Sequence, residues 1–164
     1  MPIVVDAYNV VHVTGVLPPE LAEIDVPELV RVLPRTRFAG ERVTLVCDGL
    51  PAGGAAPVRG AGSVRVRYAG GGKSADDLIA AMVQRTTAPR GLTVVSSDRA
   101  VQRAARKRRC PVLSSEEFLR RIADDLHDAS LPELLESDGP ESAGGPRGDA
   151  AAPAPPRTRT TTGP

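Results

Sequence analysis

Residues 2–6 read PIVVD, a run of β-branched side chains that stops at an acid. The same form returns as RVTLVCD at residues 42–48 and as LTVVSSD at residues 92–98. Two further segments have strand character: SVRVRY at residues 63–68 alternates polar and apolar side chains, as an edge strand would, and CPVLS at residues 110–114 is a short final run. Because continuous apolar runs suit strands that are covered on both faces, the pattern predicts a mostly parallel central sheet.

Helical patterns separate these strands. A helix is expected within residues 26–38, where an internal proline must end or bend it. Ser74 is a good N-cap for a helix over residues 75–86, another is expected over residues 98–109, and Ser115 is placed to cap a last one. Alternation of strands and helices predicts an α/β fold, a three-layer α/β/α sandwich.

The composition limits the remaining possibilities. Residues 129–164 are rich in Pro, Gly, Ala and Thr, so we expect one domain over residues 1–128 followed by a disordered tail. The two cysteines, Cys47 and Cys110, lack metal-ligand spacing and predict small buried side chains in a reduced protein. We find no signal peptide or membrane span and expect a cytoplasmic protein. The chain has two Tyr, two Phe and no Trp, so it has few aromatic side chains on which nucleic-acid bases could stack.

Acidic residues follow the predicted strands. Asp6, Asp48 and Asp98 each end an apolar run, and Asp76 opens a helix. Any one of them alone is more typical of a cap or a turn. Because the carboxyl ends of parallel strands meet at one edge of a sheet, we expect all four side chains to converge there. Carboxylates brought together repel one another, and divalent cations such as Mg²⁺ or Mn²⁺ resolve that repulsion. Such sites support metal-assisted hydrolysis of phosphodiesters.

Four segments, in order, carry a resemblance to a known family. IVVDAYNVV at residues 3–11, VTLVCDG at 43–49, KSADDLI at 73–79 and LTVVSSDRAVQ at 92–102 resemble the YacP-like NYN domains, which belong to the PIN-like superfamily of metal-dependent ribonucleases. The resemblance covers roughly residues 1–126. It implies a PIN-like fold, a Mg²⁺ or Mn²⁺ site and endonucleolytic cleavage of RNA.

The resemblance also implies roles for particular residues. The catalytic set is Asp6, Asn9, Asp76 and Asp98. The metal ligands are Asp6, Asp48, Asp76 and Asp98, of which Asp48 has the least secure role because that position varies in such families. The implied partner is RNA, whether mRNA, rRNA or tRNA, with the ribosome as one candidate setting and no membrane.

Basic residues crowd the helix that begins after Asp98. We expect RNA contacts from Lys73, Arg99, Arg103, Arg106 and Lys107. A run of charges is also typical of a solvated helix face, and Lys73 could equally be a solvated loop residue.

Other functions fit the same residues less well. The stretch YAGGGKSADDL at residues 68–78 resembles a phosphate-binding loop, but Arg67 stands where that motif needs a glycine and Asp76 and Asp77 would repel a triphosphate. A dehalogenase-type phosphatase would need an aspartate at Tyr8, and a response-regulator receiver would need a second acid next to Asp6. An RNA- or ribosome-binding module on a PIN-like scaffold, with little or no catalysis, stays open as the alternative.

Overall fold

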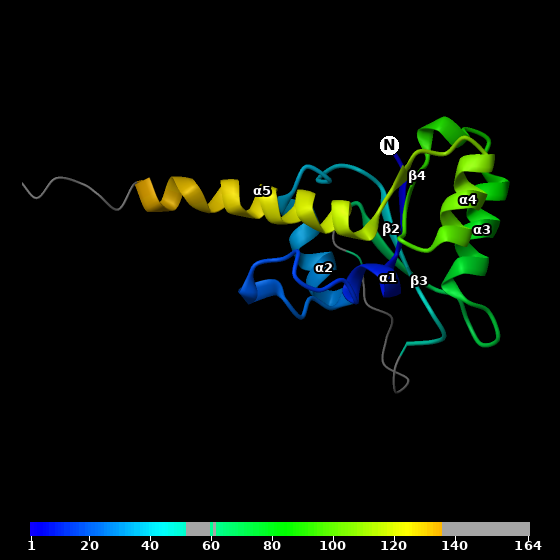
Figure 1. The fold of residues 1–164 in the computed structure, drawn as a ribbon, viewed down its shortest axis with the longest axis horizontal. Helices are drawn as coiled ribbons and strands as arrows, with labels where there is room; N and C mark the ends of the chain where they lie inside the picture. Colours follow the sequence, from blue (N-terminus) through cyan, green and yellow to red (C-terminus); the bar gives the residue numbers. More distant parts are fainter. Residues whose placement is uncertain (52–59, 61, 136–164) are drawn as a thin grey trace, which may run out of the picture.

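A computed structural model describes residues 1–51, 60 and 62–135 of the chain (Figure 1). One sheet of five strands has the order β3-β2-β1-β4-β5, and every pairing in it is parallel. The strands are β1 (Ile3–Asp6), β2 (Val43–Cys47), β3 (Val64–Tyr68), β4 (Thr93–Val95) and β5 (Val112–Leu113). The predicted parallel sheet is confirmed, and the alternating segment is the edge strand β3.

Helices cover both faces of this sheet. The α-helices are α1 (Ala7–Val11), α2 (Val26–Val32), α3 (Ala75–Arg85), α4 (Arg99–Lys107) and α5 (Ser115–Leu135). Short 3₁₀ turns lie at η1 (Pro19–Leu21), η2 (Leu33–Arg35) and η4 (Pro89–Gly91). In Figure 1, α3 and α4 lie on one side of the strands, and α1, α2 and α5 lie on the other. The predicted three-layer α/β/α sandwich is therefore confirmed.

The two cores explain why the strands are apolar throughout. In β1, Ile3 and Val5 join a cluster with Leu29 of α2 and Phe118 of α5. Val4, between them, joins a second cluster with the buried residues of α3 and α4. Successive side chains of a strand point to opposite faces, so a strand with helices on both sides needs apolar residues at every position.

Helix ends differ from the expected ones for local reasons. The helix expected over residues 26–38 leaves α geometry after Val32 and continues as a 3₁₀ turn, where Pro34 has no N–H to donate. The last helix is capped one residue earlier than expected: the Ser114 hydroxyl accepts from the backbone N–H of Glu117 at 3.1 Å. Ser115 is instead the first helical residue and is buried. Helix α1 was not expected.

Helix α5 continues past the predicted domain boundary. It ends at Leu135, so residues 129–135, which the sequence assigned to the tail, are helical. Leucines at 131, 134 and 135 favour helix, and the composition changes only after them. The rest of the expected tail, residues 136–164, lies outside the described residues. None of the helices in the described ranges is long and apolar enough to span a bilayer.

Candidate active site

Asp6 is a buried carboxylate at the carboxyl end of the central strand. It is only 1% exposed, and it is the N-cap of α1, with one oxygen accepting from the backbone N–H of Asn9 at 3.2 Å. Its other oxygen accepts from the Asn9 amide at 2.5 Å and from the Ser96 hydroxyl at 2.9 Å. A buried carboxylate needs such donors, and here they fix its orientation. Asn9, a predicted site residue, therefore lies directly on Asp6.

Ser96 connects Asp6 to the start of α4. This serine is fully buried at the end of β4. While its hydroxyl donates to Asp6, it accepts from the backbone N–H of Asp98 at 3.1 Å. Its carbonyl accepts from the Gln102 side chain at 2.8 Å. The sequence interpretation did not assign Ser96 a role, although a hydroxyl within an otherwise apolar buried run is a usable signal.

Asp98 is the N-cap of α4. One of its oxygens accepts from the backbone N–H groups of Ala100 at 2.7 Å and Val101 at 2.9 Å. Asp98 is therefore a helix cap, as the sequence also allowed, but a single one of its carboxylate oxygens does the capping. The cap uses only that oxygen, so a structural role and a role in the site are compatible.

The start of α3 is occupied by protein carboxylates. Asp48, just after β2, accepts from the backbone N–H of Ala75 at 2.7 Å. Ser74 and Asp77 form a capping box, each side chain accepting from the other residue's backbone N–H. Two of the backbone N–H groups at this helix start, those of Ser74 and Ala75, therefore already donate to carboxylates. Asp77 is a capping residue.

The four predicted acids share one electrostatic environment. The pKa of Asp76 is raised above its ordinary value of 3.8, first by partial burial and then by neighbouring carboxylates. Those carboxylates are Asp6, Asp98, Asp48 and Asp77, in decreasing order of effect. The acids at the ends of β1 and β2 and at the starts of α3 and α4 thus lie near enough to one another to influence Asp76 electrostatically.

Cys47 lies at the same edge but is not a thiolate at neutral pH. Burial, with smaller effects from Asp48 and Asp6, raises the pKa of its thiol to about 11. Both Cys47 and Cys110 are free and buried, as expected. A metal ion at this edge would therefore be held by oxygen atoms and not by the Cys47 sulfur.

The donor set fits a hard divalent cation. Mg²⁺ and Mn²⁺ prefer oxygen ligands, and Mg²⁺ usually takes one or two carboxylates while keeping several waters. In the part of the chain that the structure describes, no group of three or more His, Cys, Asp or Glu side chains is already gathered for a metal. A cation held by one or two carboxylates and by water needs no such group.

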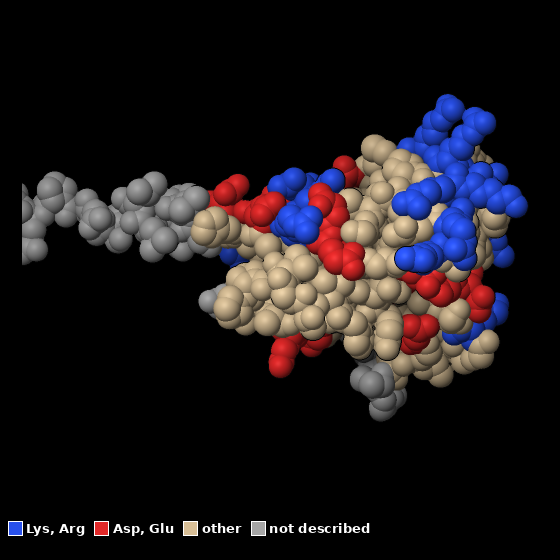
Figure 2. Space-filling view, in the orientation of Figure 1, with Lys and Arg blue, Asp and Glu red and all other residues tan. Residues whose placement is uncertain are grey.

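The predicted RNA-binding residues lie in the loop before α3 and along α4. Lys73 is exposed in the loop before α3, and Arg99, Arg103, Arg106 and Lys107 are exposed on α4. Among the described residues none of these five side chains has an ion pair or hydrogen-bond partner. Figure 2 shows Lys and Arg side chains gathered over the α4 side of the molecule, with acidic side chains next to them.

The parallel sheet with carboxylates at one edge defines a PIN-like α/β domain. The chain belongs to the YacP-like NYN domain family, whose model matches residues 3–133. Its fold is similar to the crystal structure of Rae1 (YacP) from Bacillus subtilis, with a TM-score of 0.58 and 19% identity over 84% of this chain and 83% of that one. A point mutant of the same protein gives a TM-score of 0.57 and 20% identity over 84% of both chains. No curated protein sequence matches the chain.

Proposed function

We propose that this protein is a metal-dependent endoribonuclease whose site is built from Asp6, Asp48, Asp76 and Asp98. The observation that carries the proposal is the hydrogen-bond network that orients the buried Asp6 carboxylate and links it through Ser96 to the backbone of Asp98. Asp48 accepts from the start of α3, and the pKa of Asp76 is raised by burial and by these neighbouring carboxylates. Four acids held at one sheet edge oppose one another electrostatically, and a divalent cation removes that opposition. Membership of the YacP-like NYN family supports a nuclease acting on RNA.

The residues of the chain divide the work between them. Asn9 and Ser96 hold Asp6 in one orientation, and Ser96 also fixes the backbone of Asp98. Asp6 and Asp98 are the ligands we assign first, with Asp76 and Asp48 completing the acidic edge. A bound Mg²⁺ or Mn²⁺ would supply charge neutralisation and an activated water for phosphodiester hydrolysis.

The basic residues provide affinity for the RNA backbone. Arg99 and Arg103 follow Asp98 along one face of α4 and have no partner among the described residues, so they are available to phosphates. Lys73 lies just before α3, on the other side of Asp76 in the sequence. Basic side chains thus stand before Asp76 and after Asp98 in the sequence. They favour contacts with the RNA backbone over base stacking.

The test is cleavage of a mixed pool of structured and single-stranded RNAs by the full-length protein in Mn²⁺ or Mg²⁺. We expect the unmodified protein to cut and the Asp6→Asn and Asp98→Asn proteins to lose at least a hundredfold in rate, on the order of the loss for a removed catalytic group. Asparagine is also a good N-cap, so Asp98→Asn keeps the start of α4. Asp128→Asn, an exposed carboxylate change on α5, is the matched control. Equal activity in all four proteins would refute the assignment.

A second candidate is an RNA-binding module with little or no catalysis. It is favoured by the unpartnered basic side chains on α4 and by the lack, within the described ranges, of a ready group of three ligands. RNA binding that persists in EDTA, without cleavage of free RNA or of ribosome-bound RNA in Mn²⁺, would establish this second function instead.

A further inference from the structure

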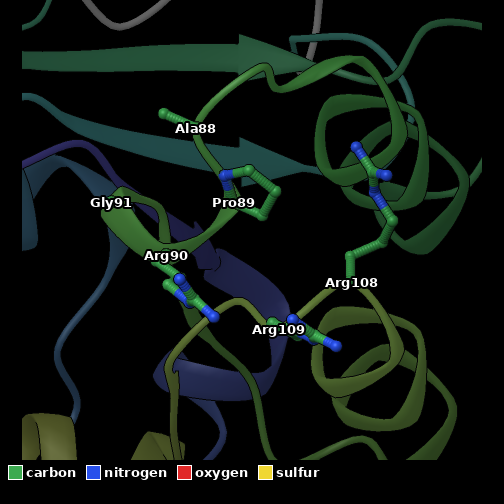
Figure 3. Close-up of a pocket in the computed structure, with 6 residues that line it drawn as sticks. All are labelled: Ala88, Pro89, Arg90, Gly91, Arg108 and Arg109. Atoms are coloured by element: carbon green, nitrogen blue, oxygen red, sulfur yellow. The ribbon is translucent and has the colours of Figure 1, made fainter.

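A pocket lies at the end of the molecule opposite the acids. It has a volume of about 350 Å³ and is lined by Ala88, Pro89, Arg90, Gly91, Arg108 and Arg109 (Figure 3). Pro89 and Gly91 bound η4, which precedes β4, whereas Asp98 follows that strand. Helix α4 then runs back from Asp98 toward Arg109. The pocket and the acidic edge are therefore at opposite ends of the same basic helix.

Arg109 has a backbone conformation that disfavours its side chain. Its φ is 60°, and among the described residues it is the one non-glycine residue with a positive φ. It follows the C-terminal turn of α4, where the N–H of Cys110 donates to the carbonyl of Ala105 at 3.0 Å. Glycine is the usual residue at such a position, and a larger one costs roughly 1 kcal/mol. Strain of this kind motivates a search for a function of the side chain.

The three arginines of the pocket have different partners. Arg108 points toward α3 in Figure 3 and donates to the carbonyls of Val83, Gln84 and Thr86, at 3.5, 3.3 and 3.1 Å. Arg90 and Arg109 are exposed, and within the described part of the chain their side chains have no ion pair or hydrogen bond. Arg108 holds the helices together, so Arg90 and Arg109 are the two guanidinium groups available to a ligand.

The chemistry of the pocket suits a nucleotide. Ala88, Pro89 and Gly91 give an apolar surface, and two free guanidinium groups stand beside it. Guanidinium groups bind phosphate in a bidentate manner, and their planes stack on bases. We propose that this pocket binds a nucleotide of the same RNA strand that is cut at the acidic edge.

The path between the two sites is basic. Helix α4 has nine residues and is about 14 Å long, which corresponds to about four phosphates at the 3.4 Å spacing of a stacked strand. Arg99, Arg103 and Arg106 lie along that path and are exposed. The inference rests on the proposed function, and it predicts that RNAs reaching several nucleotides beyond the cut are bound better than short ones.

The experiment compares short and long single-stranded RNAs on the full-length protein. KM and kcat are measured in Mn²⁺ for a 5-mer and a 15-mer of mixed sequence, and the affinity for the 15-mer is measured in EDTA at several salt concentrations. The variants are Arg109→Gly, Arg90→Ala and the double variant. Arg85→Ala, which removes an exposed charge at the end of α3 without touching the pocket, is the control.

We expect Arg109→Gly to unfold at a higher temperature than the unmodified protein, because glycine relieves the positive φ, and yet to bind the 15-mer about threefold more weakly. The double variant should bind it about tenfold more weakly, with the slope of log K against log salt reduced by about 0.7 for each arginine. The kcat values and the KM for the 5-mer should not change.

Three outcomes overturn the proposal. Affinity for the 15-mer that is unchanged in the double variant, with cleavage retained, refutes the pocket and leaves the nuclease assignment standing. An equal loss of affinity for the 15-mer in Arg85→Ala means that the pocket arginines act only through overall positive charge, and not as a nucleotide site. An unmodified protein that neither binds nor cuts RNA refutes the proposed function and the pocket with it.

Discussion

Four arginines on the α2 and α5 side of the sheet are paired with carboxylates, whereas the exposed basic residues of α4 are not. The paired residues are Arg31 with Glu28, Arg37 with Asp125, and Arg120 and Arg121 with Glu117. The unpaired residues, as far as the described chain extends, are Arg99, Arg103, Arg106 and Lys107. Residues of the same type thus serve different purposes on the two sides.

The difference concerns the electric field more than stability. Exposed ion pairs contribute little to folding, but each one cancels a charge that would otherwise attract polyanions. In the described part of the chain the α2 and α5 side is thus partly neutralised, whereas the α4 side keeps basic groups that no carboxylate pairs. The basic side is the one that adjoins the acidic edge, which is where an RNA backbone must pass if the proposed function is correct.

Arg108, the residue that ends α4 as its C-cap, is the exception among these basic residues and gives the largest expected effect on folding. Its guanidinium donates to the carbonyls at the end of α3. Arg108→Ala leaves those carbonyls without this donor, and we expect the free energy of unfolding to fall by about 2 kcal/mol. Urea denaturation measures it, and Arg106→Ala, an exposed neighbour, should change by less than about 0.5 kcal/mol. Equal losses of unfolding free energy in the two variants would show that Arg108 contributes no more to folding than an exposed arginine does.

Arg37 tests the paired side. Its side chain donates to both Asp125 oxygens, and its backbone N–H also donates to that carboxylate at 2.7 Å. Arg37→Ala should lower the free energy of unfolding by less than Arg108→Ala does, since the contact is bidentate and charge-assisted but open to solvent. The affinity for RNA, measured by fluorescence anisotropy, should be unchanged. A weaker RNA affinity would show that pairing does not take an arginine out of the binding surface.

Arg99 and Arg103 test the unpaired side. The double variant Arg99→Ala/Arg103→Ala should bind single-stranded RNA about tenfold more weakly, or about 1.4 kcal/mol, because two phosphate contacts are lost. Its urea midpoint should match that of the unmodified protein. Matched substitutions at Arg120 and Arg121 on α5 provide the control. An equal loss of affinity on α5 would mean that RNA binding has no preferred side.

The pH dependence of stability tests the paired side in a second way. Arg37 lowers the pKa of Asp125 below its ordinary value of 3.8. A carboxyl with a lowered folded-state pKa stabilises the protein above its unfolded pKa and loses that contribution as the pH falls through the folded one. The difference in unfolding free energy between the unmodified protein and Asp125→Asn should be constant from neutral pH down to about 5 and shrink below about 4. A difference that grows on acidification would contradict this cause.

The strands were predictable because their burial dictates their composition. A strand of a parallel sheet that is covered on both faces must be apolar at each position, and 2–6, 42–48 and 92–98 meet that condition. Helix α1 escaped prediction because its five residues are too few for a periodic pattern. The end of α5 escaped it because the helix runs on to Leu135, past residue 128, after which the expected tail begins.

The position of the acids at one edge of the sheet was predictable from topology, but the hydrogen bonds that orient them were not. Parallel strands bring their ends together, so Asp6 and Asp98 could be placed near one another without a structure. The hydrogen bond between Ser96 and Asp6 joins residues 90 positions apart, and no local pattern marks that pairing. The positive φ of Arg109 was equally hidden, because a run of basic residues looks the same in sequence whatever its backbone conformation.

The central claim, that the acidic edge binds a divalent cation, is tested most directly by titrating Mn²⁺ into the full-length protein and following the free ion by electron paramagnetic resonance. We predict saturable binding by the unmodified protein, binding at least tenfold weaker in Asp6→Asn and in Asp76→Asn, and no change in Asp128→Asn. Tight binding that is unaffected by Asp6→Asn and Asp76→Asn, or no binding by the unmodified protein, would contradict it.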